Sequence, residues 1–240
     1  MRSIVIIPAL NEEENIEALV KQILALNEEP LDCLVVDDHS DDGTFSRVKK
    51  INAVSPRVKV ISNPGLARGL AHCYQAGFAY AKDNHYDWII GMDADFSHAP
   101  ADISRLLAER SNADWIVGSR YCPGGSAEGL GILRYLISRL ANLYIGKKLN
   151  LKVADATSGF NCFKGLVLES IDFLSPVSEG FIFQVEMKYL AARRWFQIRE
   201  IPIHFRPRRA GASKFSSKIV LEALRRIRVL ASLGPDKVKG

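Results

Sequence analysis

The stretch Ser3-Ile4-Val5-Ile6-Ile7-Pro8 places four β-branched apolar residues in succession and ends at a proline. A short run that is apolar at every position, rather than at alternate ones, is typical of a strand buried on both faces of a parallel sheet. Beyond Asn11, apolar residues recur at helical spacing on one face, namely Ile16, Leu19, Val20, Ile23 and Leu24. The segment therefore predicts a strand, a loop and a helix, in that order.

The same unit recurs through the first half of the chain. Further strands are predicted at 31–36, 58–61, 88–92 and 115–118, and helices from residue 44 onward, at 69–82 and at 100–110. Alternating strands and helices predict an α/β fold, with a mostly parallel sheet covered by helices on both faces. Ligands of such folds bind beyond the carboxyl ends of the strands.

After Arg120 the alternation weakens. The remaining pattern predicts long helices at 133–149 and 181–192, a strand at 198–205, a basic loop at 206–214 and a final amphipathic helix at 218–232. The sequence contains no segment with the composition of a linker between domains. We therefore expect one domain over residues 1–232, followed by a tail at 233–240.

Composition narrows the class of partner. The 240 residues are 48% hydrophobic and 25% charged, and the net charge of +5 comes mostly from the region after residue 190. Such polarity favours an anionic partner, and charge alone does not distinguish nucleic acid, a phospholipid surface and a phosphorylated small molecule. Four widely spaced cysteines predict neither a disulfide framework nor a zinc site, as expected of a cytoplasmic protein. No apolar run approaches the ~20 residues of a spanning helix, so membrane contact would be peripheral.

Acidic clusters follow three of the predicted strands. Asn11-Glu12-Glu13 and Asp37-Asp38 are as well suited to capping helices as to contacting a ligand. Asp93 and Asp95, two positions apart beyond a buried strand, are suited to holding Mg²⁺ or Mn²⁺ against a diphosphate. Taken alone, this acid pair could equally be a turn that closes the strand.

Longer motifs add to this pattern. The stretch Pro8 to Glu12, the Asp37-Asp38 pair and Asp93-Ala94-Asp95 occur in the order and spacing of the family-2 glycosyltransferases, which the chain resembles and which have the GT-A nucleotide-sugar-binding fold. The resemblance narrows to the dolichyl-phosphate mannosyltransferase subfamily through five further segments, at 117–121, 134–142, 155–160, 179–186 and 208–214. Together these motifs cover residues 3–232.

The resemblance implies an activity. Mannose would move from GDP-mannose to the phosphate of a polyprenol such as dolichol, in a metal-dependent, inverting reaction. Residues 1–120 would bind the nucleotide sugar, and 121–232 would bind the acceptor and face the membrane. The same chemistry with UDP-glucose and undecaprenyl phosphate remains open, because Leu10 stands where the family often has a base-stacking Tyr. A catalytically silent nucleotide-sugar-binding subunit is another alternative, whereas the acidic clusters oppose nucleic-acid binding.

The resemblance also assigns roles by matching motifs. The nucleotide sugar would contact Pro8, Ala9, Asn11, Glu12, Asp37, Asp93, Ala94, Asp95 and Arg208. The acceptor phosphate would contact Arg120, Arg134, Ser138 and Lys214. The metal would be held by Asp93, Asp95 and Ser97, and the residues expected to act in catalysis are Asp95 and Arg120. Arginine suits phosphate because its planar guanidinium binds two oxygens at once.

A lipid acceptor requires contact with a membrane surface, here the cytoplasmic face. The segments 133–149 and 214–232, which contain the first and last of these helices, combine apolar and basic residues, as do helices that bind anionic interfaces. The first is equally expected to pack on the protein core, and the second is expected to be the more peripheral. Anchoring would come from these helices or from a partner subunit.

Overall fold

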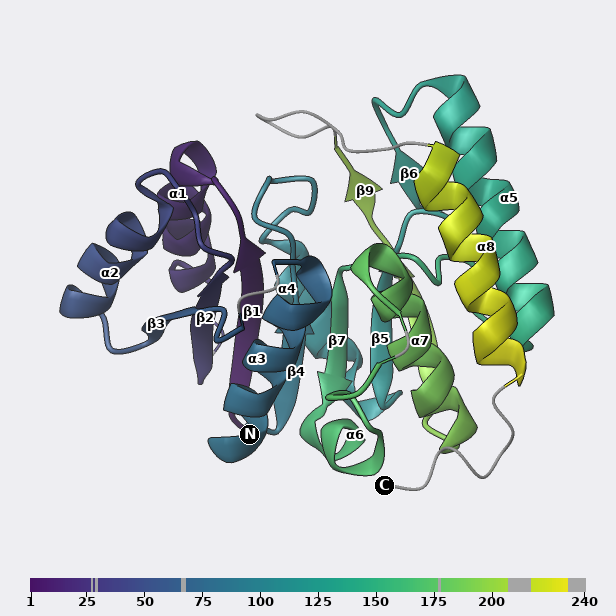
Figure 1. Cartoon of the computed structure of the whole chain (residues 1–240). Coiled ribbons are helices and arrows are strands. Elements are labelled where there is room, and N and C mark those ends of the chain that lie inside the picture. Colours follow the sequence, from purple (N-terminus) through teal and green to yellow (C-terminus); the bar gives the residue numbers. More distant parts are fainter. Residues whose placement is uncertain (27, 29, 66–67, 177, 207–216, 233–240) are drawn as a thin grey trace.

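The structure is a computed structural model that describes residues 1–26, 28, 30–65, 68–176, 178–206 and 217–232 (Figure 1). The first half forms strands β1 (Ser3–Ala9), β2 (Leu31–Asp37), β3 (Val58–Ser62), β4 (Trp88–Gly91) and β5 (Trp115–Ser119), and helices α1 (Glu13–Leu24), α2 (Thr44–Val54), α3 (Leu70–Asp83) and α4 (Asp102–Ala108). The second half forms strands β6 (Ser126–Ala127), β7 (Asn161–Lys164), β8 (Ile198–Pro202) and β9 (His204–Phe205), and helices α5 (Ile132–Leu149), α6 (Gly165–Ser170), α7 (Gly180–Arg193) and α8 (Ser217–Ser232).

The main sheet has seven strands in the order β3-β2-β1-β4-β7-β5-β8. Neighbouring strands in this sheet are parallel, except that β7 runs antiparallel to both β4 and β5. The predicted mostly parallel sheet is therefore confirmed, but β7 and the short α6 that follows it were not predicted. The strand expected at 198–205 is divided, because β9 leaves the main sheet and pairs with β6.

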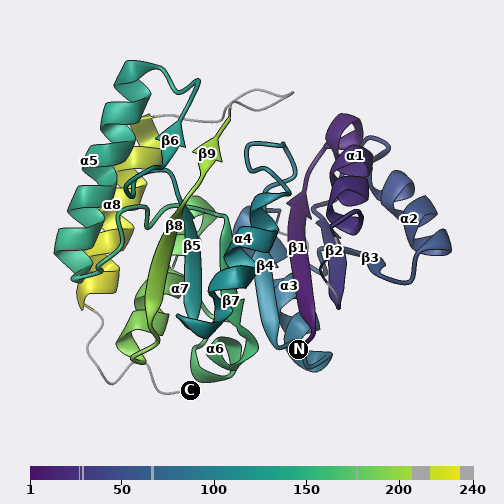
Figure 2. The ribbon, with the colours of Figure 1, turned by 180° about the vertical axis from the view of Figure 1, so that it is seen from behind.

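The apolar run of β1 is explained by its position between two layers of helices. Ile4 and Ile6 pack into a core shared with α3 and α7, whereas Val5 and Ile7 pack into a second core shared with α1 and α4. Helices α3 and α7 lie in front of the sheet in Figure 1, and α4 lies in front of it in Figure 2. Fully burying one such side chain stabilises the fold by roughly 1.5–3 kcal/mol, so a polar residue anywhere in the run would be costly.

The strand order reverses direction between β1 and β4. The chain builds β1, β2 and β3 outward on one side, and α3 then returns it to β4 on the other side of β1. In open α/β sheets the crevice at such a reversal, outside the carboxyl ends of the strands, is where ligands bind. The loops after β1, β2 and β4, which carry the acidic clusters, all open at this edge.

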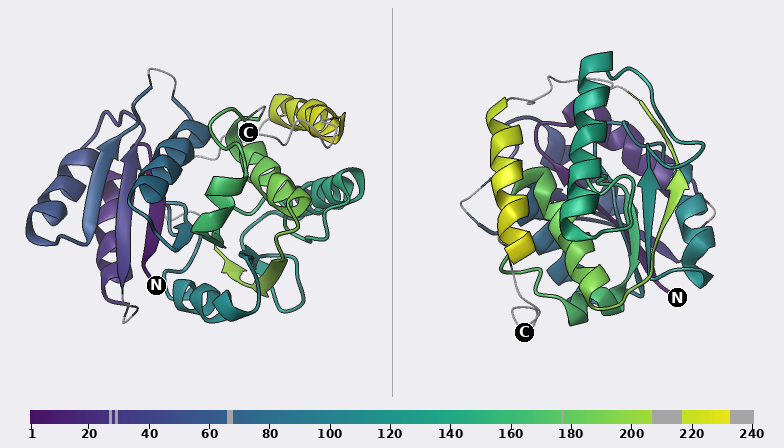
Figure 3. Two further views of the ribbon diagram at one scale, coloured as in Figure 1. Left: turned by 90° about the horizontal axis from the view of Figure 1, so that it is seen from below. Right: turned by 90° about the vertical axis from the view of Figure 1, so that its right-hand side faces the viewer.

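Helices α5 and α8 run side by side at one end of the molecule (Figure 1 and Figure 3). Helix α8 buries Ala223, Ile227 and Leu230 against α5 and α7. Helix α5 instead exposes a row of large apolar side chains, namely Ile132, Leu133, Leu136, Leu140 and Leu143. Among the side chains that the structure describes, the exposed large apolar residues at this end therefore lie mainly on α5, and α8 contributes Val229. The expectation that α8 is the more peripheral helix stays a prediction, because several of its side chains lie outside the described set. Among the described helices, none has the length and apolar character needed to cross a bilayer.

Candidate active site

The loops after β1 and β2 are joined by hydrogen bonds. Asn11 adopts a left-handed backbone conformation (φ 56°), its backbone N–H donates to Ser40 Oγ (3.0 Å), and its side-chain oxygen accepts from the Asp41 N–H (2.9 Å). Asn11 therefore ties two loops together rather than capping α1. The carboxylate of Glu12 accepts a hydrogen bond from the side chain of Asn15 (2.8 Å). Pro8 and Ala9 complete β1 and pair with Val36 and Asp37.

Asp37 and Asp38 have different environments. Asp38 accepts hydrogen bonds from the Asn63 side chain and from the Gly69 N–H, both at 2.8 Å, and so fixes the loop that precedes α3. Asp37 accepts only the Ser40 N–H at one oxygen in the described residues, and its buried Oδ1 has no hydrogen-bond partner there. A buried carboxylate oxygen without a partner is costly, so Oδ1 is a candidate acceptor for a ligand hydroxyl or N–H group.

The loop after β4 holds the acid pair. Asp95 and Ser97 are buried, and Asp95 Oδ1 accepts the Ser97 N–H (3.0 Å). The Asp93 carboxylate is more open, and its Oδ2 lies 3.9 Å from Nδ1 of His98. Burial lowers the pKa of His98, although Asp93 and Asp95 act in the opposite direction. Ala94, between the acids, is also buried.

The donor atoms of this loop fit a divalent cation. Within the described part of the chain, Ser97 Oγ and His98 Nδ1 are buried and lack a hydrogen-bond partner. Nowhere in the described residues do three or more His, Cys, Asp or Glu side chains form a cluster that could enclose a metal. Mg²⁺ is commonly held by one or two carboxylates with substrate phosphates completing its coordination, so the Asp93–Asp95 pair with Ser97 suits a metal that arrives with its substrate.

Arg120 lies at the same edge, directly after β5. Its guanidinium donates two hydrogen bonds of 2.7 Å to the two carboxylate oxygens of Asp155, which is fully buried. Burial opposes charge on both groups, but their mutual hydrogen bonds prevail, lowering the pKa of Asp155 and raising that of Arg120. The guanidinium also donates to Thr157 Oγ1 (3.0 Å). Arg120 is thus a charged group held in a fixed orientation.

Tyr121 connects Arg120 to α5. Its hydroxyl donates to Ser138 Oγ (2.7 Å), and the Arg120 and Arg139 guanidinium groups lie over its ring at 5.0 and 4.9 Å. The structure therefore brings the predicted acceptor residues Arg120 and Ser138 together. Arg134 is exposed one turn before Ser138 on α5. Arg208 and Lys214 lie outside the described residues.

Aromatic side chains fill the space between the acid pair and Arg120. The His98 ring stacks on Phe160 with centroids 4.9 Å apart and meets the edge of Phe205 at 5.6 Å. Phe205 also lies 5.3 Å from the Arg120 guanidinium carbon. The acids and the arginine therefore occupy neighbouring parts of one site, with opposite charges on either side of an aromatic cluster.

Comparison with known proteins agrees with this geometry. The family model described as "Glycosyl transferase family 2" matches residues 4–171. The chain belongs to glycosyl transferase family 2. This glycosyltransferase is 37% identical over 225 residues to polyprenol monophosphomannose synthase of Mycolicibacterium smegmatis, covering 93% of the chain and 84% of that protein. It is 38% identical over 224 residues to undecaprenyl-phosphate mannosyltransferase of Micrococcus luteus, covering 93% of the chain and 91% of that protein.

Solved structures confirm the predicted GT-A fold of the glycosyltransferase. Glucosyl-3-phosphoglycerate synthase from Mycobacterium tuberculosis, in complex with Mn²⁺, UDP-glucose and phosphoglyceric acid, superposes with a TM-score of 0.73 over 97% of this chain and 80% of that chain. The sequence identity is 17%, so this likeness concerns the fold alone.

Several residues that build the glycosyltransferase site were not predicted from the sequence. Asp155 and Thr157 hold Arg120, Asn142 exchanges hydrogen bonds with Thr157, and the buried Lys188 contacts the same segment. The signal for Lys188 was present, because Gln184, Glu186 and Lys188 interrupt an otherwise apolar helix. Polar residues at core positions of a helix indicate a built hydrogen-bond network.

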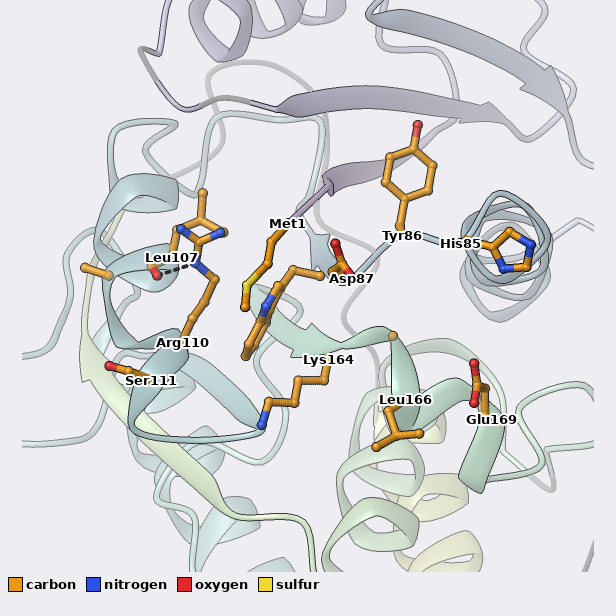
Figure 4. A pocket seen from close by; sticks show the side chains of 13 residues that line it. Met1, His85, Tyr86, Asp87, Leu107, Arg110, Ser111, Lys164, Leu166 and Glu169 are labelled. Atoms are coloured by element: carbon orange, nitrogen blue, oxygen red, sulfur yellow. Dashed lines mark hydrogen bonds between the residues drawn. The ribbon is translucent and has the colours of Figure 1, made fainter.

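A hollow of about 870 Å³ lies at the opposite edge of the sheet (Figure 4). It is lined by Met1, His85, Tyr86, Asp87, Trp88, Leu107, Ala108, Arg110, Ser111, Lys164, Gly165, Leu166 and Glu169. Trp88 begins β4 and Lys164 ends β7, so this hollow is separated from the acid pair by the length of the strands. None of the predicted site residues lines it.

Proposed function

We propose that this glycosyltransferase transfers mannose from GDP-mannose to a polyprenyl phosphate, with inversion at the anomeric carbon. The observation that carries the proposal is the fixed guanidinium of Arg120 beside the Asp93–Asp95 pair, one basic and one acidic group at a single sheet edge. An acidic pair suits a metal-bound diphosphate, and an arginine suits an acceptor that is itself a phosphate. The two bacterial relatives are named for the transfer of mannose to a polyprenyl phosphate, and these names support the same sugar and the same class of acceptor here.

On the donor side, the chain's residues would bind and orient. Asp37 Oδ1 would accept a hydrogen bond from the nucleoside, beside Pro8, Ala9, Asn11 and Glu12. Asp93, Asp95 and Ser97 would hold Mg²⁺ or Mn²⁺. When bound, such an ion neutralises the diphosphate and stabilises it as a leaving group.

On the acceptor side, the chemistry needs no general base. A phosphate monoester is already an anion, so its oxygen forms the bond to the anomeric carbon while the bond to the diphosphate breaks and the nucleoside diphosphate leaves. Arg120 and Ser138, with Arg134 and the loop carrying Arg208 and Lys214, would position this oxygen. Arg120 would also screen the repulsion between the two anionic substrates. The hydrogen bonds from Arg120 lower the pKa of the buried Asp155 carboxyl, so Asp155 stays ionised as the partner of that guanidinium.

A direct assay tests the proposal. The protein is incubated with Mn²⁺, polyprenyl phosphate and either labelled GDP-mannose or labelled UDP-glucose, and the label in the organic phase is measured. We expect transfer from GDP-mannose. Transfer from UDP-glucose alone would replace the mannosyl assignment by the glucosyl alternative, and binding of nucleotide sugar with no transfer would support a silent binding subunit.

We further propose that α5 brings the site to the cytoplasmic surface of a membrane. Leu136 and Leu140 lie within two residues of Ser138 along α5, and Arg134 and Arg139 are on the same helix, so α5 carries both an exposed apolar face and predicted acceptor residues. Exposed apolar patches rimmed by basic residues suit anionic lipid surfaces. The alternative is that a partner subunit covers the same leucines. Binding of the isolated protein to vesicles would exclude this alternative.

A further inference from the structure

Lys188 carries a fully buried ammonium group. It lies on α7 with 0% of its surface exposed. Its Nζ donates to the carbonyl oxygens of Ser158 (2.8 Å), Ala156 (3.2 Å) and Gln184 (3.3 Å). An ammonium group has three protons, so these bonds use all of them. Burying a charge is costly, and an apolar side chain would fill the same space without that cost, which indicates that the three bonds have a specific task.

Two of the three carbonyls belong to the segment 155–159. The same segment carries Asp155, whose carboxylate orients Arg120. Backbone N–H groups at the start of this segment are bound by side chains of β8 and α5. Glu200 of β8 accepts the N–H groups of Ala154 and Asp155 at 2.7 and 3.0 Å, and Asn142 of α5 accepts the N–H of Thr157 at 3.2 Å. Segment 155–159 is therefore clamped from β8, α5 and α7, and Lys188 supplies the clamp on the side of the core.

Segment 155–159 also reaches the donor half of the site. A side-chain carbon added at Gly159 would lie 3.4 Å from Asp93 Oδ1, so the backbone there runs directly beside that carboxylate. A side-chain carbon at Gly91 would lie 3.2 Å from the Gly159 carbonyl oxygen, so the segment also touches the end of β4. One short segment thus adjoins both the acid pair and the arginine.

We infer that Lys188 is a positioning residue for sugar transfer, which anchors segment 155–159 so that Asp155 holds Arg120 at a fixed place relative to Asp93. The inference rests on the proposed function in assigning the acceptor phosphate to Arg120. Lys188 touches neither substrate in this arrangement and acts through the segment. Its removal should therefore impair the use of the acceptor more than the binding of the nucleotide.

The test compares Lys188→Met with Lys164→Met. Methionine keeps the length of the side chain and removes the charge, and Lys164 forms an ion pair with Asp114 at the far edge of the sheet with 40% of its side chain exposed. We expect Lys188→Met to lower kcat/KM for polyprenyl phosphate by at least about tenfold, with little change in the Kd of GDP measured with Mn²⁺. Lys164→Met should leave both quantities within about twofold.

A double-mutant cycle separates positioning from general damage. If Lys188 acts through Arg120, then Lys188→Met should cost less than about threefold in a chain that already carries Arg120→Lys. An equal loss in both backgrounds would overturn the inference. Lys188→Arg retains the charge, so it should recover part of the acceptor kcat/KM lost in Lys188→Met, and it provides a folded variant if the methionine variant is unstable.

Hydrogen–deuterium exchange gives a readout that does not depend on turnover. In Lys188→Met the amides of residues 154–158 should exchange faster than in the wild type or in Lys164→Met, while the amides of β1 should not change. Unchanged exchange in 154–158 would overturn the anchoring role even if transfer is observed. Faster exchange with no transfer by the wild-type protein would leave the anchor intact and reject the proposed function instead.

Discussion

At the scale of single residues, Asp37 and Asp38 show that adjacent carboxylates can have separate tasks. Asp38 has both oxygens occupied by Asn63 and Gly69 and is part of the scaffold. Asp37 keeps a buried oxygen without a partner among the described residues and is the ligand candidate. The sequence places the pair at the end of a strand, but no sequence pattern distinguishes the two residues. Their different hydrogen bonding depends on Asn63, which lies in a loop 25 residues further along the chain.

This difference predicts opposite outcomes for two matched variants. Asp37→Asn should weaken GDP binding by roughly 10–100-fold, because a hydrogen bond to a charged acceptor is worth about 1.5–3 kcal/mol, and should leave the melting temperature nearly unchanged. Asp38→Asn should instead lower the melting temperature, since Gly69 and Asn63 lose a charged acceptor. Calorimetric titration and thermal denaturation of both variants check this, and equal effects on GDP binding would contradict it.

The Asp155–Arg120 pair predicts a large effect on stability. Asp155→Asn leaves a buried guanidinium without its counter-charge and should lower the free energy of unfolding by about 3–5 kcal/mol at neutral pH. Because the folded-state pKa of Asp155 is lowered, its contribution is present above its unfolded pKa of about 3.9 and is lost as pH falls through the folded value.

Urea denaturation of wild type and Asp155→Asn at neutral and acidic pH measures this dependence. The difference between the two proteins should shrink only under acidic conditions. Glu17→Gln is a suitable control, because it removes an exposed carboxylate that pairs with Lys21 and Arg47 and should change the free energy of unfolding far less than Asp155→Asn does. A difference between wild type and Asp155→Asn that persists at low pH would show that the pair's charge is not responsible.

At the scale of elements, the sequence predicted the alternating first half well. Strands β1, β2 and β4 are mostly apolar because both of their faces are buried, and each helix has one apolar face. The prediction failed at β7, because Asn161–Lys164 is only four residues long, begins with a polar residue and is positioned by pairing with β4 and β5 rather than by a local pattern. The sequence pattern also does not decide which of α5 and α8 presents an apolar face, since both are amphipathic and tertiary packing determines which face is covered.

The exposed face of α5 predicts binding to lipid. Replacing Leu136 and Leu140, which are 50% and 65% exposed, by Gln should lower binding to vesicles of anionic phospholipid by about tenfold or more, because each inserted leucine contributes up to about 1.5–3 kcal/mol. Co-sedimentation measures the effect. The matched control replaces Leu166 and Leu174, which are 56% and 61% exposed, and should bind as the wild type does. Equal binding by both double variants would argue against α5 as the contact.

At the scale of the whole molecule, the buried amino group of Lys188 affects how the free energy of unfolding depends on pH. Burial lowers the pKa of Lys188 to about 7, although Asp155 and Glu200 act in the opposite direction. The unfolded chain, in which the pKa of lysine is about 10.4, binds more protons between these values. The free energy of unfolding should therefore rise as pH increases from about 7 towards 10.

Denaturant titrations of wild type and Lys188→Met at about pH 7 and about pH 9 test this dependence. Only the wild-type protein should gain stability from Lys188 over this interval, so the difference between the two proteins should change with pH. The same change in both proteins would show that other groups cause it.

The antiparallel direction of β7 has a consequence for how this site can vary. A parallel strand in the middle of the sheet would enter from the far edge, and its preceding loop would lie beside the hollow of Figure 4. Because β7 enters from the other side, the segment before it lies beside both Asp93 and Arg120. In the proposed reaction that segment would act as a spacer, so we expect a residue inserted between 157 and 160 to alter the distance across which the sugar would pass while leaving Asp93, Asp155 and Arg120 in place chemically.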